Sequence, residues 1–280
     1  IFSAARGGSW TKTGLLHQAR SAPCAAVLRD GRALVAGGYF RVKPDWGSVG
    51  SPITLAVARP GSAPPSSPTL DDVAPPFVGA AMATAELFDP TTGTWSKTGS
   101  MRWARAGCRA VTLRDGRVLV FGAATGWESI TMSERAFDTA ELYDPETGRW
   151  SPAGRLPAGN EFGSGGSLVA TSNGGAVLIG LEWWWKHQGE RTRSFRFWPG
   201  SKTWRQIGRT WEVSFDPMEG PVTVTRGVRN LAGAAAASLP DGRVLVAGGG
   251  SVPIRRSGDQ ESGYVTVPVR DALAYVPKSN

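Results

Sequence analysis

Three arginines stand where their side chains could bind an anion together. Arg20, Arg105 and Arg229 each come shortly before a run of small and apolar residues that we expect to form a buried strand. Guanidinium groups that converge can hold a carboxylate or a phosphate through paired donors. A fourth copy has Asn160 and Glu161 in place of the arginine, so Glu161 could make such a site one-sided. The alternative is structural: the arginine recurs because it ties strands together through backbone carbonyls.

Tryptophan is the second residue type that could carry function, with 12 copies in the chain. Trp183–Trp185 are consecutive, and neighbours in a strand point to opposite faces, so at least one indole should be exposed or lie under a loop. Such rings suit a binding platform for a sugar or a protein. The alternative is that they hold long loops in place. The predicted contact surface comprises Trp46, Trp103, Trp127, Trp183, Trp184, Trp185 and Lys186, with Arg41.

The sequence contains few residues or motifs for metal binding, cofactor binding or known catalytic mechanisms. The chain has two histidines, His17 and His187, and two cysteines, Cys24 and Cys108. These numbers exclude a disulfide-rich scaffold and a cysteine-based zinc site, and we expect the cysteines to be small buried thiols. No Gly-rich phosphate loop or hydrolase motif is present. We therefore predict no metal and no cofactor, and the spacing of the carboxylates selects no catalytic pair.

An internal repeat must position these residues. The segment 84–95, Thr-Ala-Glu-Leu-Phe-Asp-Pro-Thr-Thr-Gly-Thr-Trp, is nearly repeated at 139–150. Asp-Gly-Arg followed by an apolar run recurs at 30–36, 115–121 and 241–247, with a degenerate copy at 172–180. Asp-Gly favours a tight hairpin, and proline ends the alternating strand that follows. Each copy therefore predicts four strands: a strand of small residues, the apolar run, the alternating strand and a strand that contains tryptophan.

This pattern resembles the bacterial kelch repeat of galactose-oxidase-like propellers. The resemblance implies an all-β fold: one kelch-type β-propeller domain over 1–280, with about four recognisable four-stranded blades. By analogy with kelch blades, the inner strands would lie near 20–28, 105–113, 163–171 and 231–239, and the outer strands would centre on Trp10, Trp95, Trp150 and Trp204. The chain opens with an outer strand and closes with a third strand, so we expect residues 8–13 to pair with 270–277 and close the ring. The segment 208–230 could instead hide a degenerate fifth blade.

The resemblance also raises the radical-copper chemistry of galactose oxidase. That chemistry needs two histidines, two tyrosines and a cysteine crosslinked to one of the tyrosines. Cys24 loosely matches the crosslinking cysteine of the family, but the segment that should carry its tyrosine reads Arg105-Ala-Gly-Cys108. His17 and His187 stand outside any ligand-like pairing, and the usual C-terminal domain of the oxidases is absent. We therefore predict that the protein is not a copper oxidase.

Long insertions fall at corresponding positions of the repeat. They span 39–81, 123–137, 182–192, 208–230 and 250–270. In an antiparallel four-stranded blade, both kinds of connection that carry them leave on the same face. The opposite face has only tight turns. Because function tends to sit on loops held by a rigid scaffold, we expect the insertion-rich face to be the working face.

Charge and composition limit the classes of partner that the protein could bind. The net charge is +8 and the isoelectric point is about 10.0, but basic and acidic residues are interspersed, so a solvated surface is favoured over nucleic-acid binding. No apolar run is long enough for a membrane span. The chain starts at Ile1 instead of Met, which favours a secreted or cell-envelope protein, although trimming explains it equally well. The sequence leaves oligomerisation open.

The function that we predict is a non-catalytic binding or assembly module that uses the Trp- and Arg-rich insertion face. Its partner would be a protein, or a carbohydrate or anionic ligand. The alternative is an enzyme that acts on a small anionic or carbohydrate-like ligand at the channel mouth. A deep polar pocket with an unpaired arginine and a carboxylate would favour the enzyme, and a broad apolar patch would favour the partner protein.

Overall fold

The computed structural model describes residues 2–3, 9–41, 79–122, 138–157, 166–184, 189–207, 211–213, 234–247, 252–254, 263–265 and 272–275. Throughout these residues the chain is all-β, and every strand pair is antiparallel. None of their elements is a helix long and apolar enough to cross a membrane. Four sheets of three to five strands follow one another along the chain, and two-stranded hairpins extend from them.

The first two sheets have the predicted four strands each. The first consists, in spatial order, of β3 (Cys24–Val27), β4 (Ala33–Ala36), β7 (Ala85–Asp89) and β8 (Thr94–Thr98). The second consists of β9 (Arg109–Thr112), β10 (Val118–Phe121), β11 (Thr139–Asp144) and β12 (Arg149–Arg155). The four-strand pattern that the repeat predicts is confirmed here.

The next two sheets depart from the repeat in strand length and number. The third consists of β13 (Ser167–Ala170), β14 (Ala176–Trp184), β15 (Gly189–Trp198) and β16 (Thr203–Gln206), with β17 (Trp211–Val213) added to β15. The fourth consists of β18 (Ala235–Ser238), β19 (Val244–Ala247) and β22 (Ala272–Tyr275). Of the proposed fifth unit at 208–230, the described part, Trp211–Val213, therefore belongs to the third sheet.

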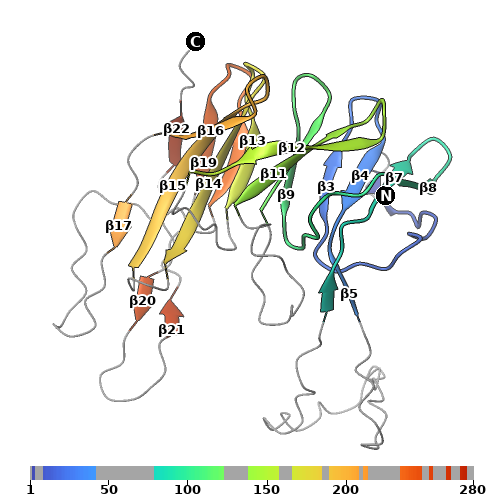
Figure 1. The fold of residues 1–280 in the computed structure, drawn as a ribbon, viewed down its shortest axis with the longest axis horizontal. Coiled ribbons are helices and arrows are strands. Elements are labelled where there is room, and N and C mark those ends of the chain that lie inside the picture. Colours follow the sequence, from blue (N-terminus) through green and yellow to red (C-terminus); the bar gives the residue numbers. More distant parts are fainter. Residues whose placement is uncertain are drawn as a thin grey trace, which may run out of the picture.

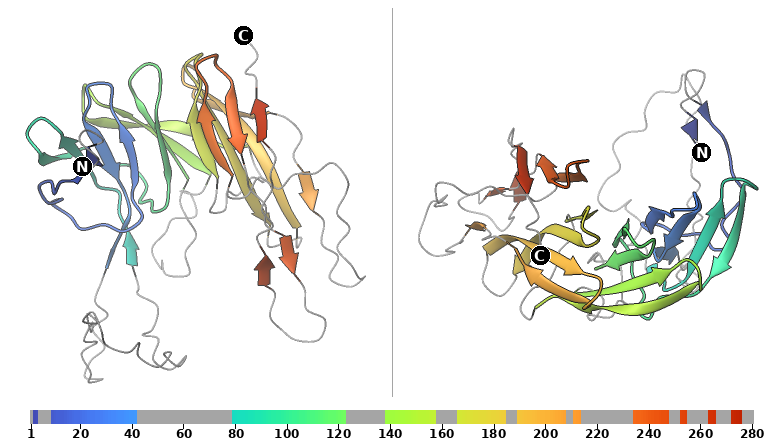
Figure 2. Two further views of the ribbon diagram at one scale, coloured as in Figure 1. Left: turned by 180° about the vertical axis from the view of Figure 1, so that it is seen from behind. Right: turned by 90° about the horizontal axis from the view of Figure 1, so that it is seen from above.

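The sheets stand side by side along an arc, with β3, β9, β13 and β18 on its inner side (Figures 1 and 2). Buried residues of neighbouring sheets share core clusters, and one such cluster holds Phe121 and Leu142 of the second sheet with Phe195 and Phe197 of the third. The repeated tryptophans pack between sheets. Trp150 Nε1 donates to the Gly99 carbonyl at 2.8 Å, as Trp204 Nε1 does to that of Ala153 at 2.9 Å. The repeat tryptophan is therefore structural at these positions.

The two cysteines differ from the expectation. Cys24 of β3 and Cys108, next to β9, form a disulfide rather than two free thiols. The inner strands of the first two sheets lie side by side, which brings the two Cα atoms to 5.3 Å, a distance within the usual range for a disulfide. Both residues are buried. The disulfide therefore links two neighbouring sheets through their shared core.

The predicted ring closure is also corrected. β2 (Ser9–Trp10) pairs with β1 (Phe2–Ser3), and the described strand β22 pairs only with β19. The N-terminal segment and the fourth sheet lie at opposite ends of the arc, so the expected pairing cannot form in this arrangement (Figure 2). Instead, the Gly14 N–H donates to the Gly93 carbonyl at 3.0 Å, which docks this segment against the first sheet.

Candidate functional site

The two ends of the sheets are built differently. At one end, called the turn end here, lie the tight turns at 28–32, 113–117, 144–146 and 239–243. At the other, called the insertion end, the chain leaves β4, β10, β14 and β19. The hairpins β5 (Tyr39–Arg41) with β6 (Gly79–Ala81), and β20 (Val252–Ile254) with β21 (Gly263–Val265), extend there (Figure 1). The long hairpin of β14 and β15 extends beyond the same end.

Arg105, one of the predicted anion ligands, is enclosed by its own sheet. Its Nη1 donates to the carbonyls of Gly122 and Thr139 at 3.1 and 2.9 Å, and its Nη2 donates to Thr139 Oγ1 at 2.9 Å. Nε and Nη2 also donate to Glu141 Oε1 at 3.3 and 3.1 Å. The Arg105 side chain is 0% exposed. Its donors therefore point into the sheet and not toward a ligand.

Arg20 repeats this arrangement in the first sheet. Its Nη1 donates to the carbonyls of Gly37 and Thr84 at 2.8 and 2.9 Å, and its Nη2 donates to Glu86 Oε1 at 2.8 Å. These acceptors correspond one by one to those of Arg105. The contacts fit the structural role considered for the repeat arginine, in which it ties strands through backbone carbonyls. Arg229 lies outside the described residues.

The glutamate partners were missed by the sequence reasoning. Glu86 also accepts the backbone N–H groups of His17 and Gln18, and Glu141 accepts those of Arg102 and Trp103. The signal was present, because an Ala-Arg pair precedes the inner strand and a glutamate follows alanine in the third strand of both copies. The third sheet has buried Phe195 in the register of this glutamate.

His17 is held in a defined orientation at the insertion end. Its Nδ1 lies 3.0 Å from Glu86 Oε2, and its side chain is 45% exposed. Burial alone would raise the pKa of Glu86, but the N–H groups of His17 and Gln18 and the Arg20 guanidinium hold that pKa below its ordinary value. The ionised carboxylate therefore fixes the imidazole.

The predicted aromatic surface is described only in part. Trp103 is partly buried, and the Arg102 guanidinium carbon lies 5.2 Å from the centroid of its ring. Trp183 and Trp184 are strand residues of β14, in register with Glu190 and Gly189. Arg41 is the last residue of β5 and pairs with Gly79. The other residues of the predicted surface and site lie outside the described residues: Trp46, Trp127, Glu161, Trp185 and Lys186.

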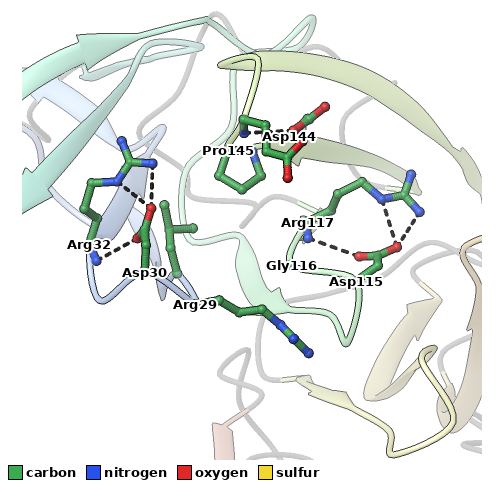
Figure 3. Close-up of a pocket in the computed structure, with 10 residues that line it drawn as sticks. Arg29, Asp30, Arg32, Asp115, Gly116, Arg117, Asp144 and Pro145 are labelled. Atoms are coloured by element: carbon green, nitrogen blue, oxygen red, sulfur yellow. Dashed lines mark hydrogen bonds and ion pairs between the residues drawn. The ribbon is translucent and has the colours of Figure 1, made fainter.

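The described residues contain a cleft at the turn end, which sequence reasoning did not single out. Its volume is about 440 Å³, and it lies between the β3–β4 turn of the first sheet and both turns of the second (Figure 3). The lining residues are Leu28, Arg29, Asp30, Arg32, Asp115, Gly116, Arg117, Asp144, Pro145 and Glu146. The size and shape of this cleft would allow it to hold a small ligand.

The charges in the cleft are largely compensated within single turns. Arg32 Nε donates to Asp30 Oδ2 at 2.8 Å, and Arg117 Nε donates to Asp115 Oδ2 at 2.9 Å. The backbone N–H groups of Glu146 and Thr147 donate to Asp144 Oδ1, and these hydrogen bonds lower the pKa of that carboxyl. The same arginine–aspartate pair recurs at Asp241 outside the cleft. These contacts shape the Asp-Gly-Arg turn, so they explain the residues without a ligand.

No metal centre is evident among the described side chains. They contain no group of three or more histidine, cysteine, aspartate or glutamate residues placed to hold a metal ion. The two cysteines are joined to each other. The chemistry that remains on the described surface is that of guanidinium, carboxylate, indole and one oriented imidazole.

Comparisons with known proteins inform the fold alone. No protein-family model matches the sequence, and no curated protein matches it. Among solved structures 142 chains match. One, titled "Structure of YjhT", has a TM-score of 0.50 and 16% identity, over 89% of this chain and 64% of that one. The chain therefore spans just under two thirds of that structure, and the likeness is one of fold.

Proposed function

We propose that the protein is a non-catalytic binding or assembly module whose sheets are blades of a kelch-type β-propeller. Two features support the propeller. Successive antiparallel sheets repeat one strand order around an arc with their first strands innermost, and a repeat tryptophan packs the outer strands of the second and third sheets against the preceding sheet. In this proposal the insertion end is the contact surface.

The observation that carries the proposal is the one-sided elaboration. The hairpins β5–β6 and β20–β21, strand β17 and the extended part of β14–β15 all lie toward one end of the sheets (Figure 1). The turn end, in contrast, is built from repeated short turns. Binding residues tend to lie on loops and hairpins that a rigid scaffold holds, so the end of the sheets that carries the added segments is the expected contact surface. Trp183 and Trp184 lie in this elaborated part, which favours a partner that offers a flat or apolar surface, such as a sugar ring.

The disulfide supports a proposal about compartment. Disulfides form and persist mainly in oxidising environments, and they are rare in the cytosol. The Cys24–Cys108 disulfide joins the first two sheets, and both of its cysteines are buried. We therefore favour a secreted or cell-envelope location, where carbohydrate and protein partners are both accessible.

An enzyme that acts on a small anionic or carbohydrate-like ligand remains the second candidate, and His17 is the observation that favours it. A base that a buried carboxylate orients is a recurring element of acid–base catalysis. The Nδ1 atom of His17 contacts Glu86, so Nε2 is the nitrogen left for a substrate. Release of nitrophenol from a panel of nitrophenyl glycosides, lost in His17→Gln, would favour the enzyme. Release that does not depend on His17 would count against it.

The binding proposal is tested on a printed array of neutral and acidic oligosaccharides. We expect labelled protein to bind a subset, and Trp184→Ala to weaken that binding at least about tenfold, which corresponds to about 1.4 kcal/mol. Arg117→Ala, at the turn end, is the matched control and should bind like the wild type. Weakened binding in Arg117→Ala with intact binding in Trp184→Ala would contradict the proposal. So would a large loss of thermal stability in Trp184→Ala with unchanged binding.

A further inference from the structure

Arg109 is an arginine that the repeat does not account for. It is the first residue of β9 and pairs with Phe121, the last residue of β10, immediately before the insertion 123–137. It therefore lies at the insertion end of an inner strand. The residues in the same register of the other three inner strands are Cys24, Ser167 and Ala235. A small side chain satisfies the fold there, so the fold itself does not require a guanidinium.

The contacts of Arg109 leave its charge uncompensated. Nε donates to the Gly166 carbonyl at 2.5 Å, and Nη1 donates to the carbonyls of Gly107 and Cys108 at 2.6 and 3.4 Å. All three acceptors are neutral. Within the described residues no acceptor contacts Nη2, and no carboxylate pairs with the side chain. Both N–H groups of Nη2 are thus available to a ligand while three carbonyls fix the plane of the guanidinium.

Electrostatics distinguish Arg109 from the repeat arginines. Burial lowers the pKa of Arg109, and no acidic group opposes that effect. Burial also lowers the pKa of Arg105, but Glu141 and Asp138 act against it. A partly desolvated cation without a counter-ion attracts an anion more strongly than a solvated or paired one. Arg105 is paired with Glu141, whereas no carboxylate of the described residues pairs with Arg109.

We propose that Arg109 binds an oxyanion of a small ligand, a carboxylate or a phosphate, through Nη2 at the insertion end of the inner strands. The planar fork of arginine suits both groups, because each offers two oxygens at matching spacing. The inference rests on the proposed function in one respect, since both place the ligand at the insertion end. It moves the anion site of the sequence prediction from Arg20 and Arg105 to an arginine four positions beyond Arg105.

A structural role for Arg109 is the competing account. The bond from Nε to Gly166 connects β9 to the residue before β13, so the side chain also joins the second and third sheets. That role would predict a loss of stability on substitution and no ligand. The experiment therefore needs a readout of anion binding that stability does not affect.

Calorimetric titration with two probes, inorganic phosphate and succinate, in a chloride-free buffer of low ionic strength tests the proposal. We expect one probe at least to saturate a single site, and the stronger one to identify the class of oxyanion. Arg109→Gln should weaken this binding at least about tenfold. Arg243→Gln removes the same charge from an exposed, Asp241-paired turn and should stay within about twofold. Absence of saturable binding to both probes, or equal binding in all three proteins, would overturn the proposal.

A second measurement applies to the wild-type protein and covers the case in which Arg109→Gln fails to fold. Phenylglyoxal modifies accessible guanidinium groups, and mass spectrometry locates the modified arginines. The stronger probe should slow modification of Arg109 at least about fivefold and leave Arg243 unchanged. Equal rates at Arg109 with and without the probe would overturn the proposal. These tests use other probes and residues than the oligosaccharide array, so failure here and failure of the proposed function are distinguishable.

Discussion

The turn end and the insertion end treat their charges in opposite ways. At the turn end the arginine of each Asp-Gly-Arg turn contacts the aspartate two residues earlier, as in Asp30–Arg32 and Asp115–Arg117, and the pair recurs at Asp241–Arg243. At the insertion end the repeat arginines are paired with buried glutamates, but Arg109 stands outside the repeat and contacts carbonyls only. Charges that recur in several copies of the repeat are explained by the fold, so the charge that does not recur is the informative one.

The largest expected effect concerns the buried pair of the repeat. Glu141→Leu leaves the Arg105 guanidinium buried without its anion, and we expect a loss of about 3–5 kcal/mol in the free energy of unfolding. The double variant Arg105→Leu with Glu141→Leu should be less destabilised than Glu141→Leu alone. Urea unfolding measures both. A double variant less stable than the single one would indicate that Arg105 has a role beyond this pair.

Removal of the disulfide should have the second-largest effect on the free energy of unfolding. Cys24→Ala with Cys108→Ala removes a link across 84 residues of sequence, and we expect a loss of about 2–4 kcal/mol. Thermal unfolding of this variant and of the wild type, with and without a reducing agent, measures the effect. The reductant should lower the wild-type melting temperature and leave the variant unchanged. Free thiols at both positions in a peptide map of the non-reduced protein would contradict the link.

Acid should act on the insertion end through Glu86. The pKa of Glu86 in the folded protein lies below its ordinary value of 4.5, so its contribution to stability is present above that value and is lost as the pH falls through the lowered pKa. Amide exchange at His17 and Gln18 should accelerate in that range, because Glu86 accepts both N–H groups. In Glu86→Gln exchange at these amides should lose its acid step. An acid step of the same size in that variant would assign it to another carboxylate.

The smallest effect is expected at the turn end. Arg117→Ala removes one side of an ion pair whose partners are 31% and 40% exposed, and such pairs contribute less than about 1 kcal/mol. Thermal unfolding should change little. A loss as large as that of Glu141→Leu would show that the turn cleft matters to the fold more than its exposed contacts indicate, and would remove the contrast between the two ends.

How far the sequence predicts this protein depends on whether a residue belongs to the repeat. Asp-Gly-Arg and the repeat tryptophan predict turns and strands correctly, because a residue that recurs reports a backbone requirement common to the copies. Gly31, Gly116 and Gly242 illustrate this, with φ between +85° and +89° in the turn that each copy needs.

The candidate site was less accessible to sequence reasoning. The sequence selects Arg20 and Arg105 because they precede inner strands and could converge, and their recurrence already favours a structural role. Their partners, Glu86 and Glu141, lie 66 and 36 residues away and become evident only in the structure. Arg109 looks unremarkable in the sequence, because only the placed neighbours show that it contacts carbonyls and no carboxylate among the described residues. The disulfide escaped for a similar reason, since 84 residues separate its cysteines.

The central expectation is that ligands contact the insertion end. Hydroxyl-radical footprinting, with and without the oligosaccharide that binds most strongly on the array, measures this in one experiment. We expect protection within 39–41, 79–81 and 180–193, and unchanged reactivity within 28–32, 113–117 and 144–146. Protection of the turn segments, with the insertion-end segments unchanged, would contradict the proposed contact surface.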